Sequence, residues 1–226
     1  MPASLPAPGC VIVHVVDPSA LADADALLSL TAGEQEQANR FRFEKDARHW
    51  RACRCALRKI LGEVLEIEAV FVPLDFAEFG KPLLREPFDD LHFNLSHCHD
   101  LALVAISYDG PLGVDLETVN RGRSLLGCEQ AFCHPDELAT LPVDEELRAS
   151  TLLDLWTSKE ALLKGLGTGM SLPPETVSLV PKGDHGAGTC PRLQPFRLHR
   201  LEHPLLEQHV ARLAAPLESE RILIVG

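Results

Sequence analysis

Two segments of this chain carry carboxylates that can converge on one site if a strand and a helix pack against each other. The first, Gly113–Glu117, carries Asp115 and Glu117, and residues two apart in a strand point to the same face. The second, Trp156–Lys164, has a helical pattern and carries Glu160. We therefore expect a fold in which this helix lies across this strand. Three converging carboxylates would form an oxygen-rich site that suits Mg²⁺ or Mn²⁺ carrying substrate phosphates, not zinc.

Charge is distributed unevenly along the sequence. The net charge of −12 argues against broad nucleic-acid binding. Residues 40–59 nevertheless hold eight arginines and lysines against only Glu44 and Asp46, an excess of six positive charges. Such a segment can bind a phosphorylated ligand or an acidic partner, and it can equally be a solvated helix face. Charge alone leaves both interpretations open.

Composition also bounds the cellular setting. No apolar run approaches the roughly 20 residues that a membrane span needs, so we expect no membrane partner. Residues 1–9 contain no basic residue and no long apolar core, which is not typical of a signal peptide. The seven cysteines are an odd number without a CxxC pair and are expected to be reduced thiols. Together these features predict a cytoplasmic protein.

The pattern of apolar residues predicts an α+β fold. Thr31 and Glu34 match a capping box, so a helix is expected from there toward Phe41. Further helices are predicted over residues 45–65, 125–132, 136–141 and 145–166. Strands are predicted over residues 10–16, 70–79, 91–95, 101–107, 112–116, 176–180, 192–198, 207–213 and 221–225. Asp109-Gly110-Pro111 predicts a turn that joins two of these strands as a hairpin, and 182–191 predicts a Gly-rich surface loop.

Several motifs in order resemble those of the 4′-phosphopantetheinyl transferases of the larger, surfactin-synthetase-activating type. The chain has that family's Gly-x-Asp-x-Glu strand and its Trp-x-x-Lys-Glu-Ala-x-x-Lys helix, at the two segments described above. Four further segments are similar to family motifs: Phe79–Pro82, Phe93–His97, Phe132–Glu137 and Gly167–Pro173. Any one of these motifs is weak, whereas their shared order and spacing make the resemblance specific from about Thr31 to Pro173.

The resemblance implies a fold and an activity. The fold would be a pseudo-twofold monomer of two similar halves, each a helix with an antiparallel sheet. Residues 1–112 would form the half with the basic helix and the coenzyme A contacts. Residues 113–226 would carry the metal carboxylates, the catalytic helix and the carrier-protein surface. The implied reaction is Mg²⁺-dependent transfer of the phosphopantetheine arm of coenzyme A to a serine of an apo carrier protein, with release of adenosine 3′,5′-bisphosphate.

Specific residues take roles under this resemblance. Asp115, Glu117 and Glu160 would hold the metal, and Glu160 or a metal-bound water would be the base. Lys164 lies four residues after Glu160, on the same helix face, where it could pair with that carboxylate and reach a phosphate oxygen. The residues that would contact coenzyme A are Lys81, Ser96, His97, Arg48 and His49. An arginine common in the family's basic helix is His49 here, so Arg48, His49 and Arg54 all stay candidates for the 3′-phosphate.

Two other classes of function compete with the transferase. A zinc-dependent hydrolase could use the cluster around His97 and His99, although Asp100 stands one residue too close for a His-x-His-x-Asp motif. A non-catalytic module could bind coenzyme A or a carrier protein, and it would tolerate loss of Glu160. We expect Trp156 to be a core residue and not a ligand contact.

Overall fold

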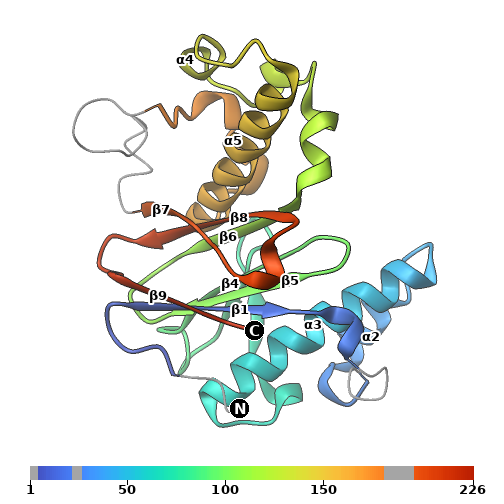
Figure 1. Cartoon of the computed structure of the whole chain (residues 1–226). Coiled ribbons are helices and arrows are strands. Elements are labelled where there is room, and N and C mark those ends of the chain that lie inside the picture. The colour runs from blue at the N-terminus through green and yellow to red at the C-terminus, as the bar shows by residue number, and fades with distance from the viewer. Residues whose placement is uncertain (1–4, 22–26, 181–195) are drawn as a thin grey trace.

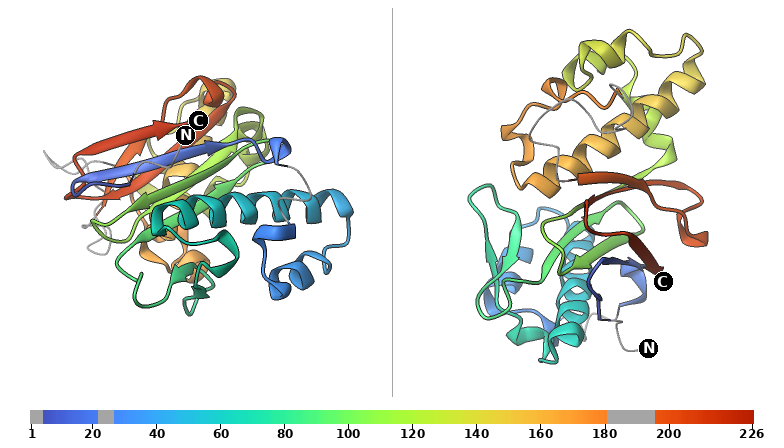
Figure 2. Two further views of the ribbon diagram at one scale, coloured as in Figure 1. Left: turned by 90° about the horizontal axis from the view of Figure 1, so that it is seen from below. Right: turned by 90° about the vertical axis from the view of Figure 1, so that its left-hand side faces the viewer.

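The fold is α+β, as predicted, and consists of two halves that each pack one long helix against one sheet. The computed structural model describes residues 5–21, 27–180 and 196–226. Within these ranges the layers follow one another as helix α3, a first sheet, a second sheet and helix α5 (Figure 1). The right-hand view of Figure 2 shows the same stacking, with the sheets between the two helices.

The two main sheets have different topologies. The first has the order β4-β5-β1-β9, in which β9 pairs parallel with β1 and the other pairs are antiparallel. The second has the order β6-β8-β7 and is antiparallel throughout. A small sheet pairs β2 with β3. The strands are β1 (Cys10–Val16), β2 (Leu74–Phe76), β3 (Pro82–Leu84), β4 (His92–His97), β5 (Ala102–Ser107), β6 (Gly113–Thr118), β7 (Phe196–Arg200), β8 (His209–Pro216) and β9 (Arg221–Val225).

Two helices of 22 residues dominate the helical part of the described chain. The α-helices are α2 (Ala32–Ala38), α3 (Glu44–Leu65), α4 (Pro135–Leu138) and α5 (Glu145–Leu166). The 3₁₀ turns are η1 (Pro18–Ala20), η2 (Ala69–Phe71), η3 (Val119–Leu125), η4 (Glu129–Ala131), η5 (Gly169–Ser171), η6 (Pro174–Thr176) and η8 (Pro204–Leu206). No helix in the described ranges combines the length and the apolar character that a membrane span requires.

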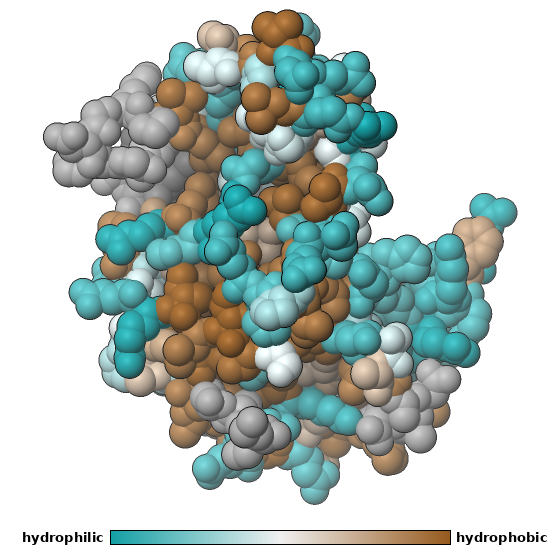
Figure 3. Space-filling view, viewed as in Figure 1, coloured by the Kyte–Doolittle hydropathy of each residue, from teal (hydrophilic) through white to brown (hydrophobic). Residues whose placement is uncertain are grey.

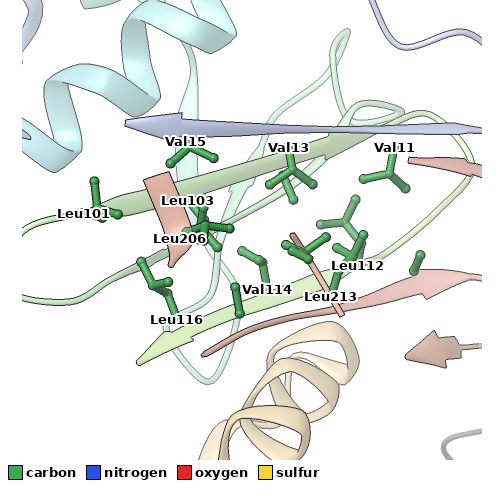
Figure 4. Packing of buried hydrophobic residues seen from close by; sticks show 14 residues of the cluster. Val11, Val13, Val15, Leu101, Leu103, Leu112, Val114, Leu116, Leu206 and Leu213 are labelled. Carbon is green, nitrogen blue, oxygen red and sulfur yellow. The ribbon is translucent and has the colours of Figure 1, made fainter. Parts of the chain in front are cut away.

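Three apolar interfaces hold these layers together. Between the sheets, side chains such as Val13 and Leu103 of the first meet Val114 and Leu213 of the second (Figure 4). On the far face of the first sheet, α3 packs residues including Leu57 and Leu61 against β1, β4 and β5. On the far face of the second sheet, α5 packs Ala161 and Leu162 against Phe196 and Ala214. Burial of this apolar surface is the main stabilising contribution to the fold.

The predicted hairpin between residues 101–107 and 112–116 is wrong. The two strands exist as β5 and β6, but they belong to different sheets, so the segment between them crosses from one layer to the next. Asp109 explains the crossing: its Oδ1 accepts from Gly9 N at 2.8 Å and its Oδ2 from Ser219 Oγ at 2.7 Å. The turn residue therefore ties both ends of the chain to this corner and does not close a two-residue loop.

Other local expectations differ from the structure in smaller ways. The helix predicted over 125–132 is replaced by the 3₁₀ turns η3 and η4, and 176–180 forms no strand. The strand predicted over 70–79 shrinks to β2. The loop predicted over 182–191 lies outside the described residues. The proposed boundary between residues 112 and 113 places β1, β4 and β5 of the first sheet on one side and β6, β7 and β8 of the second sheet on the other. The C-terminal strand β9 is an exception, because it joins the first sheet. The domain boundary itself stays a prediction.

The basic segment contributes less surface charge than its sequence suggests. Arg54 and Arg58 are buried. Arg58 Nε donates to Glu34 at 2.7 Å, its Nη1 donates to three backbone carbonyls, and Arg54 Nε lies 3.7 Å from the same carboxylate. These two cations hold α3 to α2 and to the turn after α3. The protruding end formed by α2 and the start of α3 is largely hydrophilic (Figure 3).

Candidate active site

A glycine sets how closely the acidic strand approaches the acidic helix. A Cβ on Gly113 would lie 2.1 Å from Ala161 O and 2.3 Å from Gly165 N, so β6 can run directly against α5 only without a side chain there. Helix α5 begins at the N-cap Asp144 and ends at Gly167, whose φ of 73° permits the left-handed C-cap. The helix therefore has a fixed register, which brings its last two turns beside Asp115 and Glu117.

Asp115 is held by a cation and a hydroxyl. Lys164 Nζ lies 2.7 Å from Asp115 Oδ1 and 2.9 Å from Ser96 Oγ, and Ser96 Oγ donates to Asp115 Oδ1 at 2.9 Å. The expected pairing of Lys164 with Glu160 is thus replaced by a pairing with Asp115. These three residues come from β4, β6 and α5, so the contact joins both halves of the molecule.

Glu117 is positioned by two neighbours that the sequence did not single out for this role. Trp156 Nε1 donates to Glu117 Oε1 at 3.2 Å, and Arg121 Nε lies 3.0 Å from the same oxygen. Trp156 also packs edge-on against Phe132. Trp156 packs against the core as expected. Its half-buried indole in addition lines the cavity and donates to a carboxylate, which the sequence did not indicate.

The three predicted carboxylates line one cavity. It has a volume of about 300 Å³ and is lined by Leu95, Ser96, His97, Asp115, Leu116, Glu117, Trp156, Glu160 and Lys164. Burial, and then the neighbouring charge of Asp115, raises the pKa of Glu160 above its ordinary value. Burial also raises the pKa of Glu117, against the opposing effect of Arg121. The site therefore destabilises the charged forms of Glu117 and Glu160 when no metal ion neutralises them.

These residues fit a hard divalent cation. Asp115 Oδ2 and Glu160 Oε1 are buried and have no hydrogen-bond partner among the described residues. Buried, unpartnered carboxylate oxygens are costly, and Mg²⁺ prefers oxygen ligands of this kind. Among the described residues, the carboxylate oxygens of Asp115, Glu117 and Glu160 do not all lie within 4.8 Å of one another. Closing on an ion would therefore need a side-chain rotation in at least one of them.

The structure brings His49 and His97 together at the edge of the cavity. His49 Nε2 lies 3.2 Å from His97 Nδ1, and Cys53 Sγ lies 3.6 Å from His49 Nε2. His97 is exposed as a whole residue, yet desolvation of its ring lowers its pKa, and the charges of His49 and Lys164 lower it further. His97 and His99 share no ligand set among the described residues, so the histidine pair on which the zinc hydrolase depended is not formed.

Three of the five predicted coenzyme A contacts, Lys81, Arg48 and His49, are not among the residues that line this cavity. Lys81 Nζ donates to Leu112 O at 2.9 Å and to Gly165 O at 3.4 Å, and burial lowers the pKa of this amine to about 8. The lysine thus anchors the link between the sheets to the end of α5, and its contact with coenzyme A stays a prediction. Arg48 is exposed on the first turns of α3.

Sequence reasoning missed two polar residues that support the site. Asn94 Oδ1 accepts from Val114 N at 2.8 Å and is buried between β4 and β6. Lys159, next to Glu160, is fully buried against Glu137. Both stand inside motifs quoted above, and an asparagine in an apolar strand or a lysine on the apolar face of a helix is the signal that could have identified them.

Two family models match consecutive parts of the chain. Residues 17–108 match the model described as 4′-phosphopantetheinyl transferase, N-terminal. Residues 111–214 match the model of the 4′-phosphopantetheinyl transferase superfamily. The junction between the two matches falls in the segment that crosses between the sheets.

Individual relatives agree with the family models. The 4′-phosphopantetheinyl transferase HetI of a Nostoc strain is 36% identical over 173 residues, which are 74% of this chain and 72% of the relative. The transferase gsp of Aneurinibacillus migulanus is 32% identical, over 65% of this chain and 60% of the relative. Sfp of Bacillus subtilis is 25% identical, over 65% of this chain and 64% of the relative.

The chain belongs to the 4′-phosphopantetheinyl transferase family, of the surfactin-synthetase-activating type. It is accordingly an enzyme of the holo-carrier-protein synthase class, which takes phosphopantetheine from coenzyme A and transfers it to a carrier-protein serine. A hydrolase and a non-catalytic binding module are both displaced by this assignment.

Proposed function

We propose that this transferase is Mg²⁺-dependent, that it uses the cavity between β4, β6 and α5, and that it releases adenosine 3′,5′-bisphosphate. The observation that best supports this proposal is the pair of buried, unpartnered oxygens, Asp115 Oδ2 and Glu160 Oε1, facing one cavity. Asp115, Glu117 and Glu160 would hold the ion, and Mn²⁺ would be an acceptable substitute. When bound, the ion neutralises charge on the pyrophosphate of coenzyme A.

The chain's own residues supply the remaining chemistry. Glu160 accepts the proton from the carrier serine as the serine oxygen bonds to the phosphorus that carries the pantetheine arm. The bond from that phosphorus to the oxygen of adenosine 3′,5′-bisphosphate breaks, and the bisphosphate leaves. Lys164 lines the cavity beside Asp115, where its ammonium group stabilises the negative charge that accumulates on the phosphate oxygens during transfer.

Ser96, His97, His49 and Arg48 are proposed to bind the phosphates of coenzyme A. Ser96 and His97 line the cavity, and His49 on α3 contacts His97. A phosphate bound beside the two imidazoles would favour their protonated forms, because its negative charge stabilises the positive charge of each ring. Lys81 would act indirectly, by fixing the end of α5.

The proposal is tested by incubating the protein with coenzyme A, Mg²⁺ and a panel of apo carrier proteins, followed by intact-mass measurement. At least one carrier should gain one phosphopantetheine arm, and adenosine 3′,5′-bisphosphate should appear in equal amount. Chelation of the metal should stop the reaction, and Mn²⁺ should restore it. Transfer that continues undiminished in excess chelator would contradict the metal dependence.

The same assay separates the enzyme from a binding module. Glu160→Gln keeps the shape of the side chain but cannot accept the serine proton. If the chain only bound coenzyme A and a carrier, wild type and variant would both leave the carrier mass unchanged. A mass gain with wild type that is lost with Glu160→Gln supports catalysis at this cavity.

A further inference from the structure

Three side chains beside the cavity form a set of nitrogen and sulfur ligands. His49 and Cys53 are four residues apart on α3, so they share one face of that helix. His97 ends β4 and meets them from the first sheet. Their ligand atoms all lie within 4.8 Å of one another. A set of two imidazoles and one thiol differs in chemistry from the all-oxygen carboxylate group nearby, and it suits a borderline-soft ion.

Two of the three ligand distances in this set match those around a tetrahedral zinc ion. Zinc bonds of about 2.05 Å to nitrogen and about 2.3 Å to sulfur place two nitrogens about 3.3 Å apart and a nitrogen and a sulfur about 3.6 Å apart. The two histidine nitrogens are 3.2 Å apart, and His49 Nε2 is 3.6 Å from Cys53 Sγ. His49 is thus already placed to share an ion with either neighbour, and the ligand atoms of His97 and Cys53 lie within 4.8 Å of each other.

We propose that His49, Cys53 and His97 bind one Zn²⁺ ion through three protein ligands, and that the bound ion keeps coenzyme A out of the adjacent cavity. His97 is exposed, His49 is half-buried and Cys53 is buried, which gives the ion a path from the surface inward. The fourth position would hold water. Burial raises the pKa of the Cys53 thiol to about 12, so the ion must displace the thiol proton, which is released to solvent.

The expected consequence for coenzyme A rests on the function proposed above. His49 and His97 would bind phosphate only with their ring nitrogens available, and an ion occupying His49 Nε2 and His97 Nδ1 takes those atoms away. Zinc should therefore raise the apparent Kd of coenzyme A. The Mg²⁺ carboxylates are separate residues, so added Mg²⁺ should not relieve this effect.

Zinc binding is tested directly, without any activity assay. The metal-free protein is titrated with ZnCl₂ against a chromophoric chelator, and with CoCl₂ while absorption is recorded. Wild type should take up one equivalent of zinc and show the thiolate-to-cobalt charge-transfer band of a cysteine ligand. Cys53→Ala should lose that band and bind zinc more than about tenfold more weakly. Cys55→Ala is the matched control, because Cys55 is buried on the same helix outside the ligand set, and it should behave as wild type.

Two further measurements keep the outcome decisive. If Cys53→Ala fails to fold, His49→Gln takes its place in the same titration. Calorimetry then measures coenzyme A binding with and without one equivalent of zinc. The affinity of wild type for coenzyme A should fall at least about tenfold when zinc is present, and that of Cys53→Ala, which keeps both histidines, should not change.

Absence of stoichiometric zinc in wild type, or equal zinc affinity in Cys53→Ala, overturns the site. Zinc uptake that leaves coenzyme A affinity unchanged overturns the exclusion. Failure of coenzyme A to bind even without zinc would count against the proposed function and leave the zinc site standing.

Discussion

Lys159 and Glu137 form an ion pair in the core of the C-terminal half, with Lys159 Nζ 2.6 Å from Glu137 Oε2 and both side chains essentially inaccessible. Lys159 also donates to the carbonyls of Phe132 and Pro174, and Glu137 Oε1 accepts from Leu179 N at 2.8 Å. The pair therefore ties α4, η6 and the segment after it to α5. Lys159 immediately precedes Glu160 in the motif of the catalytic helix. Its sequence position suggests a functional lysine, but its contacts give it a structural role.

Lys159→Met should destabilise the fold without altering the chemistry. Removing the cation leaves the Glu137 carboxylate buried with backbone donors alone, and breaking a buried pair in this way costs about 3–5 kcal/mol. Urea unfolding should show that loss. Lys164→Met, on the partly exposed pair, should cost less and should reduce transfer more. A Lys159→Met variant of wild-type stability would contradict the structural role.

Gly113→Ala should disrupt the approach of β6 to α5. The added Cβ would overlap the backbone at Ala161 and Gly165, which cannot move without shifting the helix, so a loss of about 3 kcal/mol or more is expected from this overpacking. Gly33→Ala is the control, because its Cβ would meet nothing within 4 Å, and in a helix it should be neutral or slightly stabilising. Thermal unfolding of both variants measures the difference; equal melting temperatures would show that the contact is not tight.

Coenzyme A affinity should fall as pH rises. Burial lowers the pKa of His49 and of His97 in the free protein, below the ordinary value of about 6.5. A bound phosphate should raise both pKa values, so binding takes up protons, and affinity is greatest at low pH and is lost as pH rises through the bound-state pKa. Calorimetry in two buffers of different ionisation enthalpy, from pH 6 to 8, measures the uptake.

His49→Arg sharpens that test. Arginine stays charged throughout this range, so the variant should bind coenzyme A more tightly than wild type at pH 8 and with a weaker dependence on pH. If the two proteins show the same pH dependence, His49 is not a phosphate contact. Arg48 would then be the better candidate for that role.

Glu160→Gln should stabilise the metal-free protein at neutral pH. Because the folded-state pKa of Glu160 is raised, its charge opposes folding above that pKa, and the penalty disappears as pH falls below the unfolded-state value. The stability of the variant relative to wild type in chelator should therefore increase as pH rises above the ordinary glutamate pKa of about 4.3, and should level off above the raised pKa of Glu160. The control is Glu145→Gln, which removes an exposed acid at the start of the same helix, outside the cavity lining. Asp115 is a poorer choice, since its partner Lys164 would be left unpaired.

The sequence was most informative where local signals and tertiary packing agree. Helix α5 has the predicted limits because Asp144 caps its start and Gly167 ends it. The carboxylate positions followed from strand and helix periodicity. The hairpin at Asp109 failed because a turn motif does not reveal that its carboxylate binds Gly9 and Ser219, both about a hundred residues away. Charge counting failed at Arg58 because its partner Glu34 lies on another helix.

Partner choice within the site was equally inaccessible to sequence spacing. An i, i+4 rule paired Lys164 with Glu160, whereas the packing of β6 against α5 offers it Asp115. The sequence indicated Trp156 only as a core residue. Its hydrogen bond to Glu117 forms through the packing of α5 against β6, which sequence spacing does not show. These choices depend on tertiary geometry that no local pattern encodes.

Single-turnover transfer by Glu160→Gln, at saturating Mg²⁺ and coenzyme A, tests the central claim most directly. Its amide oxygen can still coordinate the metal, so the variant should bind both ligands, but it cannot accept the serine proton. The rate should fall at least about 100-fold, the lower end for loss of a general base. Glu145→Gln should react at the wild-type rate. A Glu160→Gln rate within a few-fold of wild type would contradict the assignment of Glu160 as the base.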